Sequence, residues 1–215
     1  NFAGKDINKA IHYLNLSVDQ GNEYAAALLG TIYYDGSVQK DIDKSMHYLN
    51  IAFEKNNSND AALHLGHLYI EKQVIKKAIY YYEIASKNNY TDAQYCLGRI
   101  YYDGKFVPID IKKAMHYFSL AANQNMPKAQ YYLAVIYIDK RYCLESIKEA
   151  IYYFKLSADQ NFEKSQLILG IIYNENIYVP RDINKAIYYF ELSSRQGNAK
   201  AQFYLGQIYY LGNDV

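Results

Sequence analysis

The stretch that decides the fold runs from Asp182 to Gly212 and reads DINKAIYYFELSSRQGNAKAQFYLGQIYYLG. Asp182 is a residue type that caps helix N-termini, and no Gly or Pro interrupts residues 183–196 behind it. Gly197 ends this run, and Gly212 ends a second run that begins at about Ala199. Because Gly enters the left-handed conformation easily, it commonly follows the last residue of a helix. The stretch therefore predicts two helices joined by a tight turn.

The same pattern returns along the whole chain with a period close to 36 residues. One marker is a small residue followed by an apolar residue and a Tyr, at Ala10, Ser45, Ala78, Ala114, Ala150 and Ala186. The other is the Gly of a Leu-Gly pair, at Gly30, Gly66, Gly98, Gly170 and Gly206, with Ala134 in the remaining repeat. Two markers with one period predict a single array of about six hairpins. Their ranges are about 5–39, 40–74, 75–109, 110–144, 145–180 and 181–215.

The helix ends predicted for the last hairpin recur in the others. The N-cap position of the first helix holds Asp6, Asp41, Asp110 and Ser146, all capping residues, and only the third repeat has Val74 there. The position after the first helix holds Gly21, Asn89, Asn125 and Asn161, which tolerate the left-handed conformation. The junction into the third repeat is also shorter than the others, so we expect the array to be least regular there.

The apolar pattern predicts that the first helix of each hairpin is packed on several sides and that the second buries one stripe. In the first helix, only a narrow sector with His12, Asn15 and Asp19 is polar. The second helix has an inward stripe that includes Ala201, Leu205, Ile208 and Tyr209, and Gly206 lies within it. A Gly inside a helix costs about 1 kcal/mol relative to Ala, so its recurrence implies close approach of two helices. An all-α, α/α solenoid of about twelve helices follows.

Composition excludes several classes of protein. The 215 residues are 51% hydrophobic and 21% charged, unlike a disordered chain, and the net charge of +1 lacks the basic excess of a general nucleic-acid binder. No apolar run is long enough to cross a bilayer, and no signal peptide opens the sequence. The 27 Tyr residues are unusual, and we interpret Tyr13, Tyr33 and their counterparts as core aromatics.

The motifs carry a resemblance to a known family. "Leu-Gly-x-Ile-Tyr-Tyr-x-Gly", "Val-Pro-x-Asp-Ile-x-Lys-Ala-Ile-x-Tyr" and "Gln-Gly-Asn-x-x-Ala-Gln" resemble the Sel-one-like repeat, a relative of the tetratricopeptide repeat. Residues 170–206 match it almost continuously. The resemblance implies a right-handed superhelix that acts as an adaptor or scaffold, binding a protein or peptide partner on a concave surface lined by the first helices. A regulatory or spacer arm of a signalling protein, with a kinase or ubiquitin-ligase domain, is an alternative. A hydrolase like the cysteine-rich relatives is a further, weaker one.

If the first helices line a groove, their polar sector supplies the candidate binding residues. One position along this sector holds His12, His47, Tyr80, His116, Tyr152 and Tyr188. The other candidates are Asn15, Asn50, Glu83, Lys155, Glu191 and Arg195. The full sector, which includes Asp19, Glu54, Lys87 and Asp159, has five acids and three bases. Such a surface suits a polypeptide bound by stacking and hydrogen bonds, and it disfavours a phosphate backbone. A plain solvated face is the competing interpretation.

No catalytic or cofactor motif is present: the sequence lacks a phosphate-binding glycine loop, a nucleophile elbow and paired-cysteine zinc spacing. His64, His67 and Glu71 share one helix face, as zinc ligands can, but their first-repeat counterparts face outward, which favours surface histidines. We therefore expect no metal, no cofactor and no enzyme activity. Cys143 and Cys96 are predicted to lie too far apart for a disulfide. Some secreted members of the family that the chain resembles carry paired cysteines inside each repeat, and the absence of such pairs here favours a reducing, cytoplasmic location.

The ends of the sequence both fall in predicted linkers, without the polar outer face of a capping repeat. We therefore expect the sequence to be a piece of a longer protein. As an isolated piece it would expose apolar ends that can associate end to end.

Overall fold

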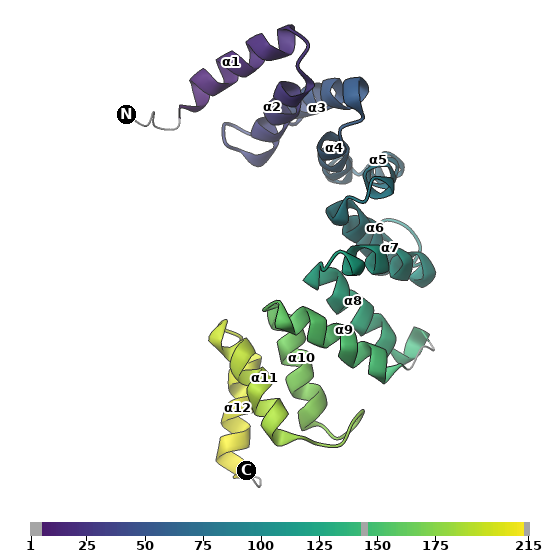
Figure 1. Cartoon of the computed structure of the whole chain (residues 1–215), viewed down its shortest axis with the longest axis vertical. Helices are drawn as coiled ribbons and strands as arrows, with labels where there is room; N and C mark the ends of the chain where they lie inside the picture. Colours follow the sequence, from purple (N-terminus) through teal and green to yellow (C-terminus); the bar gives the residue numbers. More distant parts are fainter. Residues whose placement is uncertain (1–5, 143–145, 213–215) are drawn as a thin grey trace. The chain divides into compact units, whose positions relative to one another are not determined.

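The computed structural model describes residues 6–142 and 146–212, and the regular elements of this part are all helical. Figure 1 labels them in chain order. Their bounds are α1 Ile7–Asp19, α2 Glu23–Asp35, α3 Ile42–Asn56, α4 Asn59–Glu71, α5 Ile75–Lys87, α6 Thr91–Asp103, α7 Ile111–Asn123, α8 Pro127–Ile138, the 3-10 turn η1 Lys140–Tyr142, α9 Ile147–Asp159, α10 Glu163–Asn174, α11 Ile183–Arg195 and α12 Ala199–Leu211. The odd-numbered helices are the first helices of the hairpins, and the even-numbered helices are the second.

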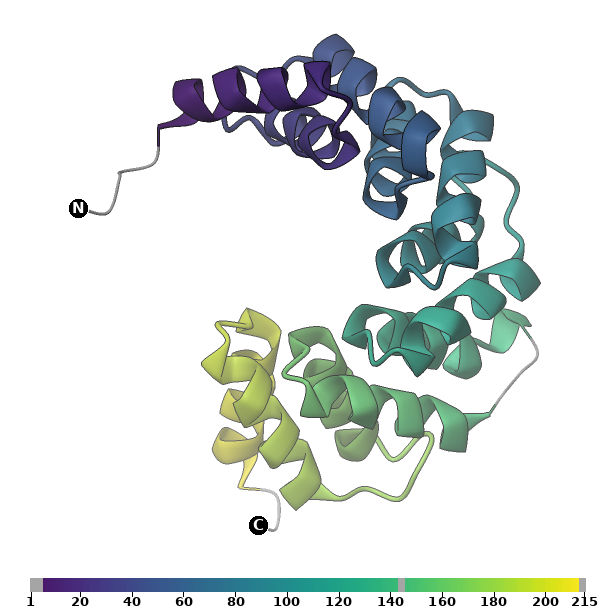
Figure 2. The ribbon, with the colours of Figure 1, turned by 45° about the horizontal axis from the view of Figure 1, so that its top comes forward.

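The helices group into two compact units, residues 1–97 and 98–215, and the boundary lies within α6. In unit 1, each helix from α1 to α4 packs against the next along the chain. In unit 2, the same holds from α7 to α12 (Figure 2). The predicted all-α array of hairpins is thus present in each unit. That the six hairpins form one continuous right-handed solenoid stays a prediction.

The helix ends follow the predicted cap residues. Asp6, Asp41, Asp110 and Asp182 each accept a hydrogen bond from the backbone N–H three residues on, at 2.9–3.1 Å. Val74 makes no side-chain cap bond, as predicted. Ser146 was predicted to cap α9, and this was wrong, because its hydroxyl donates to the Glu149 carboxylate instead. The residues after the first helices, Gly21, Asn89, Asn125, Asn161 and Gly197, all have positive φ between 59° and 88°.

The recurrent glycine marks a tight contact between helices. A Cβ built on Gly66 would lie 2.4 Å from the Tyr82 ring, and one on Gly170 would lie 2.5 Å from the Phe190 ring. The close approach is therefore real, and it joins a second helix to the first helix of the following hairpin. Gly206 on α12 has nothing within 4 Å, so the predicted inward position was wrong for this glycine. Tyr209 of the same predicted stripe is 59% exposed.

Candidate functional site

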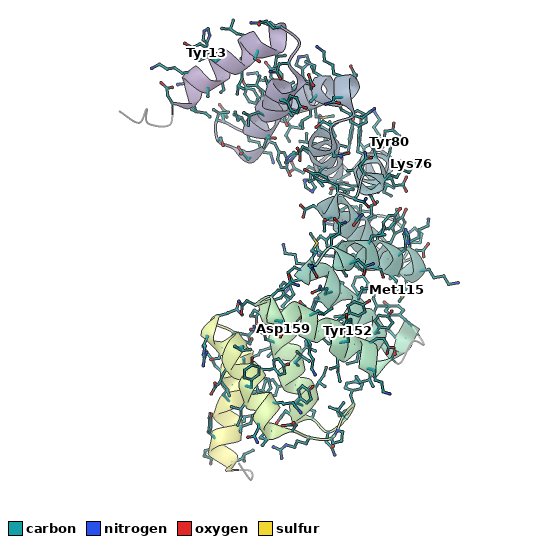
Figure 3. The ribbon with its side chains drawn as sticks, viewed as in Figure 1. Tyr13, Lys76, Tyr80, Met115, Tyr152 and Asp159 are labelled. Atoms are coloured by element: carbon teal, nitrogen blue, oxygen red, sulfur yellow. The ribbon has the colours of Figure 1, made fainter. Side chains whose placement is uncertain are left out.

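One exposed ring lies at the same position on every first helix, and we call this set the aromatic ladder. Its tyrosines have nearly equal exposed fractions: 55% for Tyr80, 57% for Tyr152 and 56% for Tyr188 (Figure 3 labels the first two). The whole set is exposed, as predicted, and consists of His12, His47, Tyr80, His116, Tyr152 and Tyr188. The first three belong to unit 1 and the last three to unit 2. The repeated backbone therefore sets the exposure of the ring in both units.

A buried or half-buried tyrosine contacts the ring of each ladder tyrosine. The ring of Tyr188 meets the ring of Tyr189 edge-on, with centroids 5.1 Å apart. Tyr189 in turn stacks on Tyr173 of the preceding second helix, at 5.9 Å and 5° between planes. Desolvation by burial, with Tyr173 alongside, raises the pKa of Tyr189 to about 12. The same two-layer arrangement places Tyr152 on Tyr153, which stacks on Tyr137. A ladder ring therefore loses little freedom when it binds.

A lysine in the first turn of the first helix lies over the ring of the second-helix tyrosine in each of three such pairs. Lys185 Nζ lies 5.3 Å from the centroid of the Tyr173 ring and 2.6 Å from an Asp182 carboxylate oxygen. Lys44 and Lys113 lie over Tyr33 and Tyr101 in the same way, at 5.2 and 4.8 Å. These lysines pair with the capping Asp of their own helix.

The other six candidates are Asn15, Asn50, Glu83, Lys155, Glu191 and Arg195, and we call them the second row. Some of them have structural partners, in both units. Asn15 donates to the Ile11 carbonyl and accepts a 2.6 Å hydrogen bond from the Tyr48 hydroxyl, so it fastens α1 to α3. Glu191 and Arg195 form an ion pair along α11, at 3.5 Å. The remaining three are half-buried: Asn50, Glu83 and Lys155. That the ladder and this row together line a concave groove stays a prediction.

The sequence analysis missed a cluster of rings in unit 1. His64 and His67 were predicted to be surface histidines, and this was wrong, because both are half-buried. The His67 ring stacks near Tyr34 and meets Tyr82 edge-on, with centroids 6.2 and 5.6 Å apart. Cys96 Sγ lies 3.6 Å from His67 Nε2. The cluster joins α2, α4, α5 and α6.

Burial determines how this cluster ionises. Desolvation lowers the pKa of His64 and of His67, against the opposing effect of nearby acids. Burial, together with Glu71, raises the pKa of Tyr34. The buried His64 Nδ1 has no hydrogen-bond partner. Near neutral pH these two imidazoles and the Tyr34 hydroxyl are therefore held uncharged, as a polar part of the core.

His64, His67 and Glu71 share this face of α4 without forming a group of metal ligands. Within residues 6–142 and 146–212, no three His, Cys, Asp or Glu side chains are grouped so that they could hold a metal ion. Glu71 is instead bound by Lys40, at 3.0 Å. Cys143 lies outside the described residues, so its predicted separation from Cys96 is not tested.

The comparisons with known proteins agree with this architecture. A family model described as Sel1 repeat matches residues 2–22, 23–57, 60–90, 91–126, 127–162, 164–198 and 199–215. The chain belongs to the Sel1 repeat family. The resemblance stated from the sequence is thereby confirmed, and Sel1 repeats commonly build protein-interaction scaffolds. The matched segment 23–57 spans α2 and α3, so the Sel1 unit pairs a second helix with the next first helix, as the glycine contacts do.

Solved structures of similar fold include longer repeat arrays. A Sel1 repeat protein from Oxalobacter formigenes has a TM-score of 0.81 and 26% identity, over 99% of this chain and 64% of that one. A protective antigen of uropathogenic Escherichia coli with an SLR fold has a TM-score of 0.81 and 23% identity, over 93% of this chain and 44% of the antigen. An immunity protein from Pseudomonas aeruginosa is less similar, with a TM-score of 0.54 and 18% identity over 86% of this chain and 72% of that one. The chain thus spans about two thirds or less of the two arrays it matches best among these three. No curated protein matches the sequence.

Hydropathy gives one further fact about this Sel1 chain. None of the helices in the described ranges is both long and apolar enough to cross a membrane. The cytoplasmic location stays a prediction.

Proposed function

We propose that this Sel1 repeat chain is a non-enzymatic scaffold that holds a partner polypeptide along the exposed faces of its first helices. One observation carries the proposal. Among the described residues, the large hydrophobic side chains that are exposed within the helices α3 to α11 themselves are Tyr80, Tyr152 and Tyr188, whereas Val74, Ile109, Ile177 and Tyr178 lie in the connections between helices. All three occupy the same ladder position on a first helix.

The alternative surface for binding a partner is the face of the second helices. Its aromatic side chains are half-buried in the interior of each unit, as Tyr34, Tyr95, Tyr131 and Tyr132 are. Consecutive second helices also contact one another directly, α2 with α4 and α10 with α12. These interior rings are therefore engaged by neighbouring helices, whereas the ladder tyrosines keep more than half of their surface available.

The chemistry of the ladder suits a polypeptide. Tyr offers a broad apolar face and a hydroxyl with only two side-chain torsions to fix, and Tyr is enriched among residues that dominate binding energy. The tyrosine that follows Tyr152 and the one that follows Tyr188 meet these ladder rings edge-on and limit their orientations. Acids outnumber bases in the surrounding sector, which disfavours a nucleic acid. A groove formed by these rings is part of the proposal.

The test is a selection of peptides from a random displayed library on the whole chain. Peptides that bind are then measured against the double variant Tyr152→Ala/Tyr188→Ala. We expect the affinity to fall by about thirtyfold or more, the effect typical of a binding hot spot. Tyr178→Ala is the matched control, because Tyr178 is a 40% exposed tyrosine in the loop before α11 and outside the ladder.

The control separates binding from folding. Both variants should keep the wild-type circular dichroism spectrum and melting temperature, because the replaced side chains are exposed. Peptides that bind the double variant as tightly as the wild type would contradict the proposal. So would peptides whose affinity falls equally in Tyr178→Ala.

A further inference from the structure

The first helices of unit 2 carry two kinds of lysine in their first turn. Lys113 of α7 and Lys185 of α11 are engaged, because each pairs with the capping Asp of its own helix and lies over a buried tyrosine ring. Lys112 of α7 and Lys148 of α9 are exposed, and in the part of the chain that the structure describes neither forms an ion pair. The charge of these two lysines is therefore available to a ligand.

The unpaired lysines lie next to the aromatic ladder. Lys148 precedes Tyr152 by four residues on α9, and Lys112 stands at the same position on α7. Residues four apart are neighbours on one face of a helix. The same spacing places Lys76 beside Tyr80 on α5 (Figure 3). A segment that stacks on a ladder ring can therefore reach a lysine ammonium with an acidic side chain of its own.

The charge of the ladder face differs between the two units. We define this face as the polar sector of the first helices together with the position four residues before each ladder ring. In unit 2 it carries four bases and two acids: Lys112, Lys148, Lys155, Arg195, Asp159 and Glu191. In unit 1 it carries two bases and four acids: Lys76, Lys87, Asp19, Asp43, Glu54 and Glu83. The excess of acids in the polar sector thus belongs to unit 1, and the ladder face of unit 2 is basic.

Within unit 2, the positive charge is concentrated around Tyr152. Lys148 lies four residues before this ring and Lys155 lies three residues after it, on the same helix. The ion pair along α11 leaves the ladder face of that helix neutral. The remaining acid is Asp159, which is exposed at the C-terminal end of α9 (Figure 3). A carboxylate beside Tyr152 therefore meets bases on both sides along the helix.

We propose that the partner segment held by unit 2 is acidic, with carboxylate side chains interspersed with aromatic or large apolar ones. Its apolar side chains stack on Tyr152 and Tyr188, and its carboxylates pair with Lys112 and Lys148. The inference rests on the proposed function, because it names the chemistry of the segment that the ladder holds. Complementary charge of this kind speeds association and selects among partners. A nucleic acid fits less well, because the bases exceed the acids by only two and a phosphate backbone gains affinity from many basic contacts.

The test uses the whole chain and two fluorescent peptides of equal length. In one peptide Asp and Glu alternate with Tyr and Leu, and in the other Asn and Gln replace the acids. Fluorescence anisotropy at low ionic strength should show that the acidic peptide binds at least about tenfold more tightly. Salt at about 0.5 M should remove most of this difference, because it screens exposed charges.

A pair of lysine variants locates the contact. Lys112→Glu/Lys148→Glu should lower the affinity for the acidic peptide at least about tenfold and leave the affinity for the neutral peptide unchanged. Lys128→Glu/Lys164→Glu is the matched control, because it changes the net charge equally and places Glu on α8 and α10 instead. All four lysines are exposed and are the second residue of their helix, where an acid is well tolerated, so both variants should keep the wild-type circular dichroism spectrum. An equal loss of affinity in the control would overturn the inference, because net charge alone would then explain the binding.

The outcomes separate this inference from the proposed function. If both peptides bind equally well and both lose affinity in Tyr152→Ala/Tyr188→Ala, the acidic partner is overturned and the ladder stands as the binding surface. The reverse result, in which the lysine pair matters and the tyrosine pair does not, would contradict the proposed function. An acidic peptide that does not bind the wild type would overturn the inference. So would a single-stranded oligonucleotide that binds more tightly than this peptide, and the ladder face would then be a nucleic-acid surface.

Discussion

Helices α4 and α10 occupy the same place in the repeat, one in each unit, yet they differ in what they bury. Around the recurrent glycine, α4 reads His64-Leu-Gly-His-Leu-Tyr69 and α10 reads Ile168-Leu-Gly-Ile-Ile-Tyr173. The glycine has the same structural role in both helices, because it leaves room for a ring of the next helix. A Cβ built on the glycine would lie 2.4 Å from that ring in α4 and 2.5 Å from it in α10. Each final Tyr also stacks on a Tyr of the next helix.

The difference lies in the two positions that flank the Leu-Gly pair. In α4 they are the half-buried imidazoles of the ring cluster, and in α10 they are the aliphatic Ile168 and Ile171, packed against the core of unit 2. The comparison teaches that glycine and tyrosine fix the path of the backbone, while the flanking positions are open to polar or apolar chemistry. Only unit 1 uses them for groups that titrate near neutral pH.

The largest expected effect concerns the contact between the glycine and a ring of the next helix, which α4 and α10 share. Gly66→Ala and Gly170→Ala should each lower the free energy of unfolding, because overpacking costs about 1–3 kcal/mol and the helix-propensity gain of up to about 1 kcal/mol only partly offsets it. The rings of Tyr82 and Phe190 are almost fully buried and have little room to move. Urea unfolding of the whole chain measures the change.

Gly206→Ala is the matched control for these two variants. Its Cβ would meet open space, so only the propensity gain applies and the chain should become more stable by up to about 1 kcal/mol. Destabilisation of one interior variant without the other would break the proposed equivalence of α4 and α10.

A smaller effect separates the helices that follow α4 and α10. Asp182 caps α11, whereas Val74 leaves α5 without a side-chain cap. Asp182→Ala should cost about 0.5–2 kcal/mol, typically about 1 kcal/mol. Val74→Asp should stabilise the chain by up to about 1 kcal/mol, because Val74 is 40% exposed and an Asp there adds the missing acceptor. Thermal unfolding compares the two, and equal signs would contradict this assignment of the caps.

Much of the fold could be predicted because the signals are local and recur. The capping Asp residues and the Gly or Asn after each first helix act through backbone groups of their own turn. These residues therefore have the same effect in each repeat that contains them. The exposure of Tyr80, Tyr152 and Tyr188 could also be predicted, because the spacing of apolar residues within one helix shows which of its sectors faces solvent.

Burial that depends on a neighbouring hairpin could not be read from one repeat. His64 and His67 were compared with Leu28 and Thr31 of the first hairpin, where Leu28 is 51% exposed. In the interior of unit 1, α2 and α6 supply Tyr34 and Cys96 to cover the histidine rings. The prediction was wrong in the opposite sense for Tyr13 and Tyr209. Both were predicted to be buried, and both are exposed on a helix face that the structure leaves open. In a repeat array each face is covered by the adjacent repeat, so terminal copies are a poor guide to interior ones.

The smallest expected effect is confined to mild acid and tests the polar half of the comparison. Burial holds the pKa of His64 and of His67 below the value of about 6.5 found in unfolded chains. As the pH falls below about 6.5, the unfolded state binds protons that the folded state does not, so stability decreases with falling pH. Asp35 and Asp60 face His64, while Asp92 and Glu71 face His67, and their charges limit the loss.

Hydrogen exchange read by mass spectrometry can locate this loss. Between pH 7.5 and 5.5, exchange corrected for its intrinsic pH dependence should accelerate in α4 and α5 and stay constant in α10 and α11. The variant His64→Ile/His67→Ile copies the residues of α10 into α4 and should abolish the acceleration. His116→Ala is the control, because His116 is exposed on α7 and its removal should leave the pH dependence of unit 1 intact. Equal acceleration in both units would show that the response to acid comes from groups other than the buried imidazoles.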